Sequence, residues 1–425
     1  MAPVELVRMR KLLFGILCLW GVAQTVLRAD DGDLNKAIDK AVEILDKYAN
    51  EKNDTAPAEA FQKAKGLAIL NIFKGGFIFS GSGGTGLVTV KMKNGKWSPP
   101  SAISAGGFGI GLQAGGSNID YVILMNTLGG TTESLEVAKA AVAAGKPLVT
   151  ANKALLAERG AELIPLAQKA RVPIYFEASV AGGIPVLKAL REGLVANQLL
   201  GLHGIINGTC NYILSRMAEE GSDFSSALQQ AKELGYAEAD DRLDVDGIDA
   251  AHKAAILCLL AYGFLPPFPK VPVEGIRNLS AQDVSFARQL GYAIKLLAVV
   301  RPVGPERVEV RVSPTLIPAR HPMASVHGVF NAVGLVGNLS GPVQFTGRGA
   351  GPDATSSALL ADLGEAARHL QDKSPGPVLP SGGEKIRLIE PGDSVGRFYV
   401  RFEVRDQPGV LAQIAGIFGA EKIGI

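Results

Sequence analysis

The stretch ELGYAEADDRLDVDGIDAAHKAAIL, residues 233–257, joins an acidic loop to the start of an apolar helix. Asp249 and Lys253 are four residues apart in it, so both side chains lie on one face of that helix. On a solvated helix they would form an ordinary ion pair worth about 0.3–0.5 kcal/mol. The segment that follows, AAILCLLAY, is apolar and must be largely buried. A buried lysine has a tunable pKa and can donate a proton near neutral pH, which favours a chemical role.

The same loop contains DVDG, which looks like part of a calcium-binding EF-hand. The required spacing puts Arg242 at the first ligand position and Lys253 at the last. Cations at both positions exclude this alternative.

Outward from this stretch, helices and strands alternate from Thr127 onward, which predicts a parallel sheet. The expected helices are 133–144, 153–170, 222–234, 249–262 and 353–371. The expected strands are 147–150, 173–177, 306–318, 325–346 and, near the end of the chain, 397–404.

The first part of the chain has a different pattern, with a helix at 33–50 followed by short glycine-broken strands. These strands are expected at 67–73, 76–80, 86–92 and 107–113, with a hairpin turn at Asn94-Gly95. Gly81, Gly83 and Gly86 spell the dinucleotide fingerprint G-x-G-x-x-G, but LVTVKMKNGKW follows where a helix would have to start. We therefore predict tight turns between strands here and no nucleotide loop.

Several consecutive motifs of this first part carry a family resemblance. GGFIFSGSGGTG (75–86), NGKWSPPSAIS (94–104), GGFGIGLQAGG (106–116) and DYVILMNT (120–127) resemble the SYLF domain. That family is linked to lipid and actin binding. The resemblance implies a compact β-rich domain that makes lipid contact, and it identifies no binding residue.

From Gly129 to about Gln371 the sequence resembles homoserine dehydrogenase. The matching segments are GGTT (129–132), PLVTANKALLAERG (147–160), FEASVAGGIP (176–185), GIINGTCNYILSRM (204–217), the stretch at 233–257 and FTGRGAGPDATSSALLADL (345–363). Asp241 stands where the family usually has proline, and we expect this departure to loosen the turn without removing a functional group.

The resemblance implies oxidation of L-homoserine to L-aspartate 4-semialdehyde, with NADP or NAD as cofactor and Na⁺ or K⁺ as a monovalent cation. It assigns substrate binding to Glu238 and Asp249, and protonation of the substrate alkoxide to Lys253. Lys153 would reach both cofactor and substrate. The implied cofactor residues are Gly129, Gly130, Thr131, Lys153, Gly349 and Gly351, and the implied cation ligands are Glu177, Val180, Gly182 and Ile184.

A complete family member begins with a strand, a G-x-G-x-x-G loop and a helix, where this chain has the SYLF-like segment. Without that loop the hydride donor is poorly oriented, so we expect at most weak activity. NAD and NADP cannot be distinguished, because the residue that reads the ribose belongs to the same missing part.

The expected fold class is multi-domain: a β-rich SYLF-like domain, an α/β incomplete Rossmann half and an α+β catalytic domain. The domains are a signal-like segment (1–29), the SYLF-like domain (30–127), an incomplete NAD(P)-binding domain (128–176 with 346–373), the catalytic domain (177–345), a linker (374–396) and a truncated ACT domain (397–425). The last resembles the start of an ACT regulatory domain through RFYVRFEVRDQPGVLAQIAGIF (397–418). We also expect a homo-oligomer.

The formal net charge of +2 implies no attraction to nucleic acid. Three scattered cysteines form neither a disulfide framework nor a zinc site. A basic flank before the apolar run 12–23 is typical of a secretory signal peptide, whereas the dehydrogenase resemblance implies the cytoplasm. Two alternatives to an oxidoreductase therefore remain. One is a secreted or envelope lipid-binding protein with a silent dehydrogenase remnant, and the other is a fused gene product with no single function.

Overall fold

The computed structural model describes residues 66–76, 79–90, 101–110, 117–125, 130–238, 240–372, 374–380, 383 and 385–424, with positions 39 and 43. It divides the chain into two compact units. The first comprises Met1–Val149, Lys169–Tyr175 and Leu360–Pro377, and the second comprises Thr150–Gln168, Phe176–Leu359 and Val378–Ile425. The signal-like segment and the Asn94-Gly95 turn lie outside the described residues.

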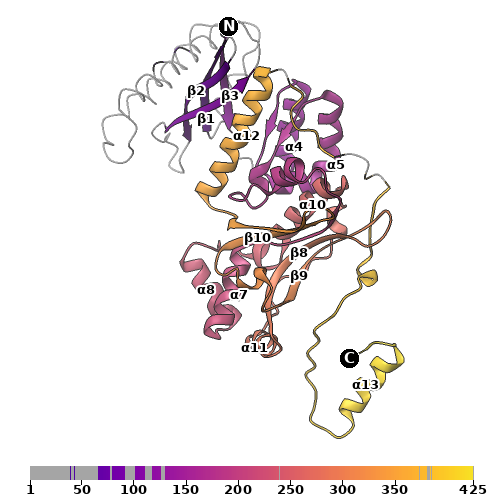
Figure 1. Cartoon of the computed structure of the whole chain (residues 1–425). Helices are drawn as coiled ribbons and strands as arrows, with labels where there is room; N and C mark the ends of the chain where they lie inside the picture. The colour runs from indigo at the N-terminus through magenta and orange to yellow at the C-terminus, as the bar shows by residue number, and fades with distance from the viewer. Residues whose placement is uncertain are drawn as a thin grey trace. The chain divides into compact units, whose positions relative to one another are not determined.

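A four-stranded antiparallel sheet forms the start of the first unit (Figure 1). Its strands are β1 (Gly66–Gly76), β2 (Phe79–Val90), β3 (Ser101–Ile110) and β4 (Ser117–Met125), in the order β3-β2-β1-β4. The fingerprint glycines lie inside β2, where Gly86 pairs with Leu70 on one side and Ile103 on the other. The prediction that they form tight turns between strands is wrong, since all three lie in mid-strand. A paired strand offers no helix N-terminus to a pyrophosphate, so the fingerprint spacing does not mark a nucleotide loop at these residues.

The expectation of two separate strands at 76–80 and 86–92 is wrong. β2 (Phe79–Val90) joins the end of the first range to the beginning of the second without a break, because backbone pairing on both sides keeps the glycine stretch extended.

The rest of the first unit is an α/β arrangement. β5 (Leu148–Val149) and β6 (Ile174–Tyr175) pair in parallel, as the alternation of helices and strands predicts. The predicted ranges were longer at both strands. The helix α4 (Thr132–Ala143) precedes β5. The helix α5 (Lys153–Ala170) follows β5 in the sequence, and its residues up to Gln168 belong to the second unit. In the described residues, no strand of the first sheet pairs with β5 or β6.

The second unit is built on a six-stranded sheet with the order β11-β10-β7-β8-β9-β12. Its strands are β7 (Leu199–Ile205), β8 (Tyr292–Pro302), β9 (Arg307–Pro318), β10 (Phe330–Gly337), β11 (Gly341–Arg348) and β12 (Arg387–Leu388). Figure 1 shows α7 (Gly208–Glu220) and α11 (Ala281–Gln289) beside strands β8 to β10, with α8 (Phe224–Glu233) next to α7. The helix α10 (Ile248–Tyr262) is buried along its length from Asp249 to Leu260, as its apolar sequence predicts.

Two further expectations need correction. The range 325–346 is not one strand, because the chain reverses after Gly337 and forms the antiparallel pair β10 and β11. The range 397–404 is not a strand, although Phe398, Val400, Phe402 and Val404 alternate along it. These side chains are exposed, and no neighbouring strand among the described residues pairs with this segment. The helix α13 (Val410–Ala420) follows it.

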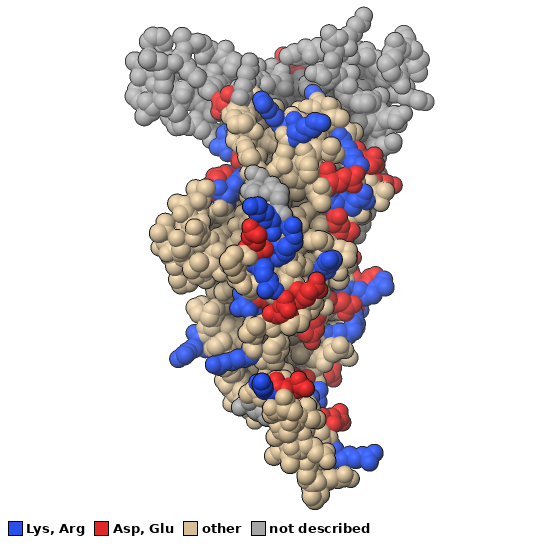
Figure 2. Space-filling view, turned by 90° about the vertical axis from the view of Figure 1, so that its right-hand side faces the viewer, with Lys and Arg blue, Asp and Glu red and all other residues tan. Residues whose placement is uncertain are grey.

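Helices long and apolar enough to cross a membrane do not occur in the described part of the chain. Figure 2 shows acidic and basic side chains interspersed over the described surface of one face, in line with the small net charge.

Candidate active site

The predicted pair Asp249 and Lys253 lies at the start of α10. Lys253 Nζ donates to Asp249 Oδ2 at 2.7 Å and to the carbonyl oxygen of Ile206 at 2.8 Å. Both side chains are buried, each with 7% of the residue exposed. The surface ion-pair alternative is therefore wrong, and the lysine ties the first turns of α10 to the end of β7.

Lys153, the first residue of α5, brings a second ammonium to the same carboxylate. Its Nζ lies 3.2 Å from Asp249 Oδ1, and its side chain is partly exposed. The turn before it is fixed by Asn152, whose Oδ1 accepts the backbone N–H of Leu155 at 3.0 Å. A lysine at a helix start is opposed by the helix dipole, so the ion pair with Asp249 explains its placement.

Asn207 is a site residue that sequence reasoning missed. It caps α7, where its Oδ1 accepts the N–H of Cys210 at 2.8 Å. Its Nδ2 donates to Asp244 Oδ1 at 2.7 Å and to Asp249 Oδ2 at 2.9 Å. The signal for the cap was the Asn-Gly-Thr sequence between a strand and a helix. Its bonds to the two carboxylates had no local signal.

The pKa values of the two carboxylates that accept from Asn207 are shifted in opposite directions. Burial is the largest influence on Asp249 and would raise its pKa, but Lys253 and Lys153 outweigh it and hold the pKa at about 2. Burial raises the pKa of Asp244, and the negative charge of Asp249 adds to this. Asp249 is therefore ionised at neutral pH, and such a separation of pKa values is typical of catalytic centres.

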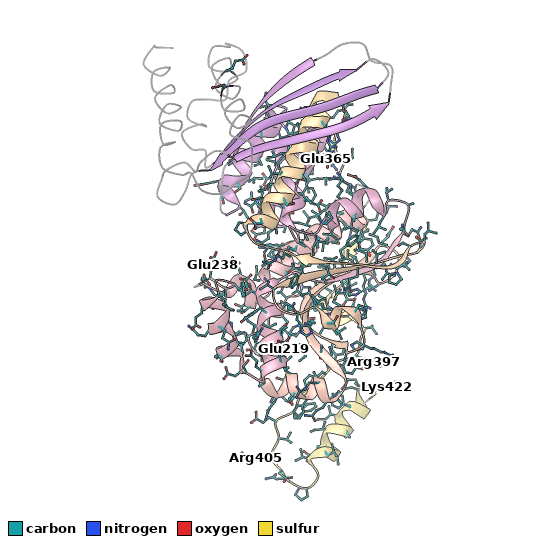
Figure 3. The ribbon with its side chains drawn as sticks, turned by 60° about the vertical axis from the view of Figure 1, so that its left-hand side comes forward. Glu219, Glu238, Glu365, Arg397, Arg405 and Lys422 are labelled. Carbon is teal, nitrogen blue, oxygen red and sulfur yellow. The ribbon has the colours of Figure 1, made fainter. Side chains whose placement is uncertain are left out.

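Glu238 is not brought into contact with this cluster. It is exposed in the loop between α8 and α9 (Arg242–Val245), and Figure 3 shows it at the periphery of the ribbon. No hydrogen bond or ion pair joins it to Asp249 or Lys253 in the described residues. Its substrate-binding role stays a prediction.

The loop predicted to bind a cation follows β6. The buried Glu177 carboxylate accepts the backbone N–H groups of Leu187 at 3.0 Å and Lys188 at 2.9 Å, at the start of α6 (Val186–Lys188). The carbonyl oxygen of Ile184 accepts the N–H of Val186 at 2.7 Å. Val180 is buried, and Gly182 donates its own N–H to the carbonyl oxygen of Gly349 at 2.9 Å.

No group of three or more His, Cys, Asp or Glu side chains in the described residues could hold a metal ion. The predicted cation site has one carboxylate and three backbone carbonyl groups as ligands, so it is not a site of that kind and stays a prediction.

The segment before α12 (Pro352–Asp372) is closely packed against its neighbours, a side chain in one place and backbone in another. A Cβ added at Gly349 would lie 2.0 Å from Asn331 Nδ2, and one at Gly183 would lie 2.3 Å from the carbonyl oxygen of Arg348. Gly351 has a φ of +108°, which favours glycine, and directly precedes the helix. The expected position at a helix start is confirmed, and the phosphate contact stays a prediction.

The remaining predicted cofactor residues belong to the first unit. Gly130 has a φ of +74°, and Thr131 is the N-cap residue of α4, where its side chain makes no capping hydrogen bond to that helix. Gly129 lies outside the described residues.

Comparison with known proteins adds to this geometry. The family model for homoserine dehydrogenase matches residues 185–363. The chain is 43% identical to the homoserine dehydrogenase of Neisseria gonorrhoeae over 311 residues, which is 72% of this chain and 71% of that protein. It is 44% identical to the Pseudomonas aeruginosa homoserine dehydrogenase over 323 residues, covering 72% of each. The crystal structure of a homoserine dehydrogenase from Thiobacillus denitrificans matches with a TM-score of 0.61 and 42% identity, covering 68% of each chain. This chain belongs to the homoserine dehydrogenase family.

Proposed function

We propose that the chain interconverts L-homoserine and L-aspartate 4-semialdehyde with NAD(P)⁺ and NAD(P)H, a step towards threonine, methionine and isoleucine. The observation that carries this proposal is the buried carboxylate of Asp249, which has an ammonium group at each of its two oxygens. Membership of the family supports the choice of reaction.

Hydrogen-bond counting supports a direct role for Lys253. An ammonium group has three N–H donors. Two of them go to Asp249 and to the carbonyl of Ile206. The third donor is left for a substrate oxygen, to which Lys253 delivers a proton during reduction of the aldehyde and from which it takes one during oxidation of the alcohol.

Asp249 is suited to hold the substrate ammonium group. Its Oδ2 accepts from Lys253 and Asn207, while Oδ1 contacts Lys153 alone among the described residues. A carboxylate oxygen takes about two donors, so Oδ1 keeps a position for a charged N–H group. Lys153 is half exposed beside it, which places a cation where a substrate carboxylate can be neutralised.

The nicotinamide cofactor, when bound, supplies or takes up the hydride. The residues of this chain fit the nicotinamide cofactor in part. Lys153 lies in the site, and Gly349 and Gly351 stand before a long helix. Gly81 to Gly86 do not fit the pyrophosphate, since they lie inside β2. Positioning contributes up to about 7–11 kcal/mol to such reactions, so we propose weak turnover.

The test measures oxidation of NADPH with aspartate semialdehyde for the full chain, Lys253→Ala and Lys270→Ala. Lys270 is an exposed lysine outside the site and serves as the matched control. We expect the Lys253 variant to lose about 10²–10⁴-fold of the activity and the control to lose none. Equal activity in all three proteins contradicts the role of Lys253. Turnover within the ordinary range of about 1–10³ s⁻¹ contradicts the weak-turnover proposal.

The cation proposal concerns Glu177 with the carbonyl groups of Val180, Gly182 and Ile184, which suit Na⁺ or K⁺ as oxygen ligands. Burial of the Glu177 carboxylate in this loop supports it.

A second candidate function concerns residues 66–125. The four-stranded antiparallel sheet favours the β-rich domain that the SYLF resemblance implies, with lipid as ligand. Sedimentation with anionic liposomes tests this function separately from NADPH binding.

A further inference from the structure

The loop between α8 and α10 carries Glu238 and is anchored on one side of it. Thr209 Oγ1 donates to the carbonyl oxygen of Tyr236 at 2.6 Å, and the N–H of Ala237 donates to the carbonyl oxygen of Ala231 at 3.2 Å. The loop therefore leaves α8 along a fixed path, and the orientation of Glu238 depends on what holds the chain after it.

Asp241 holds the other side. Its Oδ2 lies 2.7 Å from Lys232 Nζ in α8, and its Oδ1 accepts from Arg277 Nη2 at 2.9 Å. Arg277 also donates from Nε to Asp246 Oδ1 at 2.9 Å. The carboxylate thus connects three segments: α8, the acidic loop and the chain before α11.

The backbone of Asp241 extends this connection to the active site. Its carbonyl oxygen accepts the N–H groups of Asp244 at 3.0 Å and Val245 at 2.9 Å, which forms the short helix α9. Asp244 in turn shares the Asn207 amide with Asp249. Movement of Asp241 would therefore shift both Glu238 and the hydrogen bonds around Asp249.

We infer that Asp241, Lys232 and Arg277 form an ionic latch that positions the acidic loop for substrate binding. Asp241 is a positioning residue, and the inference rests on the proposed function. The sequence alone favours a looser turn with an aspartate here, but the side chain is buried and paired with two cations, which supports a restrained turn instead. Its φ of −86° is about 20° from the value of about −65° that a proline ring imposes, a backbone region that a proline reaches with a small adjustment. Ion pairs therefore restrain the backbone where the family's proline would do so covalently.

The charge state supports the latch. The hydrogen bond from Lys232 is the largest influence on Asp241 and lowers its pKa, and Arg277 acts in the same direction. Its neighbour Asp240 pairs with neither Lys232 nor Arg277. That residue pairs with Arg242, two positions away, and both side chains are largely exposed. Asp240 therefore offers a control with the same charge and almost the same position.

The experiment compares the full-length chain with Asp241→Asn, Asp241→Pro and Asp240→Asn in steady-state kinetics with homoserine. Removal of two partly exposed ion pairs should raise KM in Asp241→Asn by about three- to tenfold, with less than about a twofold change in kcat. Asp241→Pro should restore KM, and Asp240→Asn should leave it unchanged. Added salt should raise KM of the natural chain more than that of Asp241→Pro.

A second readout does not need activity. Hydrogen exchange of peptides spanning residues 236–247 should be faster in Asp241→Asn and return to the natural rate in Asp241→Pro. If the natural chain has no turnover but exchange follows this pattern, the proposed reaction fails and the latch stands. Exchange in Asp241→Asn equal to that of the natural chain overturns the latch. Altered exchange with an unchanged KM overturns its role in substrate binding.

Discussion

Replacing Asp249 by asparagine tests the carboxylate at the centre of the candidate active site. The change keeps the size of the side chain and removes its charge. In the natural chain the two carboxylate oxygens accept from Lys253, Lys153 and Asn207. The asparagine variant has only one side-chain oxygen to offer them. The new amide N–H₂ group must face at least one of these donors. If the amide faces Lys253, that buried ammonium keeps the carbonyl oxygen of Ile206 as its remaining partner among the described residues.

The loss of stability follows from the pKa of Asp249, which is lowered from 3.8 to about 2. The folded-state pKa is below the unfolded value, so the ionised carboxylate stabilises the fold fully above about pH 4. This contribution is lost as the pH falls from about 4 to about 2. The difference corresponds to about 2.5 kcal/mol at neutral pH. Breaking a buried ion pair from one side costs about 3–5 kcal/mol, so we expect Asp249→Asn to lose about 2–4 kcal/mol at pH 7.

Urea unfolding followed by circular dichroism measures this loss. Tryptophan fluorescence is unsuitable, since Trp20 and Trp97 are the only tryptophans and both lie far from α10 in the sequence. Hydrogen exchange along α10 localises the effect. The double variant with Lys253→Met serves as a control, because removing both charges should cost less than the sum of the single changes. A loss below about 0.5 kcal/mol at pH 7, or one that is undiminished near pH 2, would refute the electrostatic reasoning.

Three further predictions concern residues around the site. Burial lowers the pKa of Lys295 from 10.5 to about 8, so the cost of its buried charge is present below pH 8 and relieved between pH 8 and 10.5. The free energy of unfolding of the natural chain, relative to that of Lys295→Met, should then rise by up to about 3 kcal/mol over that range in chemical denaturation. A difference between the two proteins that does not change with pH contradicts this. Gly349→Ala should lose about 1–3 kcal/mol through its clash with Asn331. Gly364→Ala, with nothing within 4 Å of the added atom, should lose none in the same thermal melts, and equal losses contradict the packing argument. Glu177→Gln should abolish any rise in rate when choline is replaced by potassium or sodium, and an unchanged response removes the cation proposal.

The sequence predicts those features that depend on local periodicity. α5 spans residues 153–170, as expected, and α10 begins one residue before the expected start, because their apolar positions recur at helical spacing. The contact between Asp249 and Lys253 follows from the same spacing, since a helix brings positions four apart together whatever surrounds it. Burial of that helix followed from its composition.

Features that depend on distant partners were not predictable in this way. Asn207 lies 37 residues from Asp244 and 42 from Asp249, so nothing near it in the sequence indicates that it joins their carboxylates. The alternation at 397–404 satisfies the pattern of a strand, but a strand also needs a neighbour, which periodicity does not reveal. The two strands expected at 76–80 and 86–92 have the same explanation. Glycines interrupt the alternation of apolar and polar residues there, but the backbone pairing of β2 with β1 and β3 continues through them.

The double use of Asn207 has a consequence for how this enzyme tolerates mutation. One amide group both caps α7 and donates to the two carboxylates, so a change at this residue would disturb the start of that helix and the candidate site together. Selection for a stable α7 then also maintains the site, even in a lineage where the reaction has become slow. The proposed catalytic residues can thus persist as a structural element after their chemical use has declined.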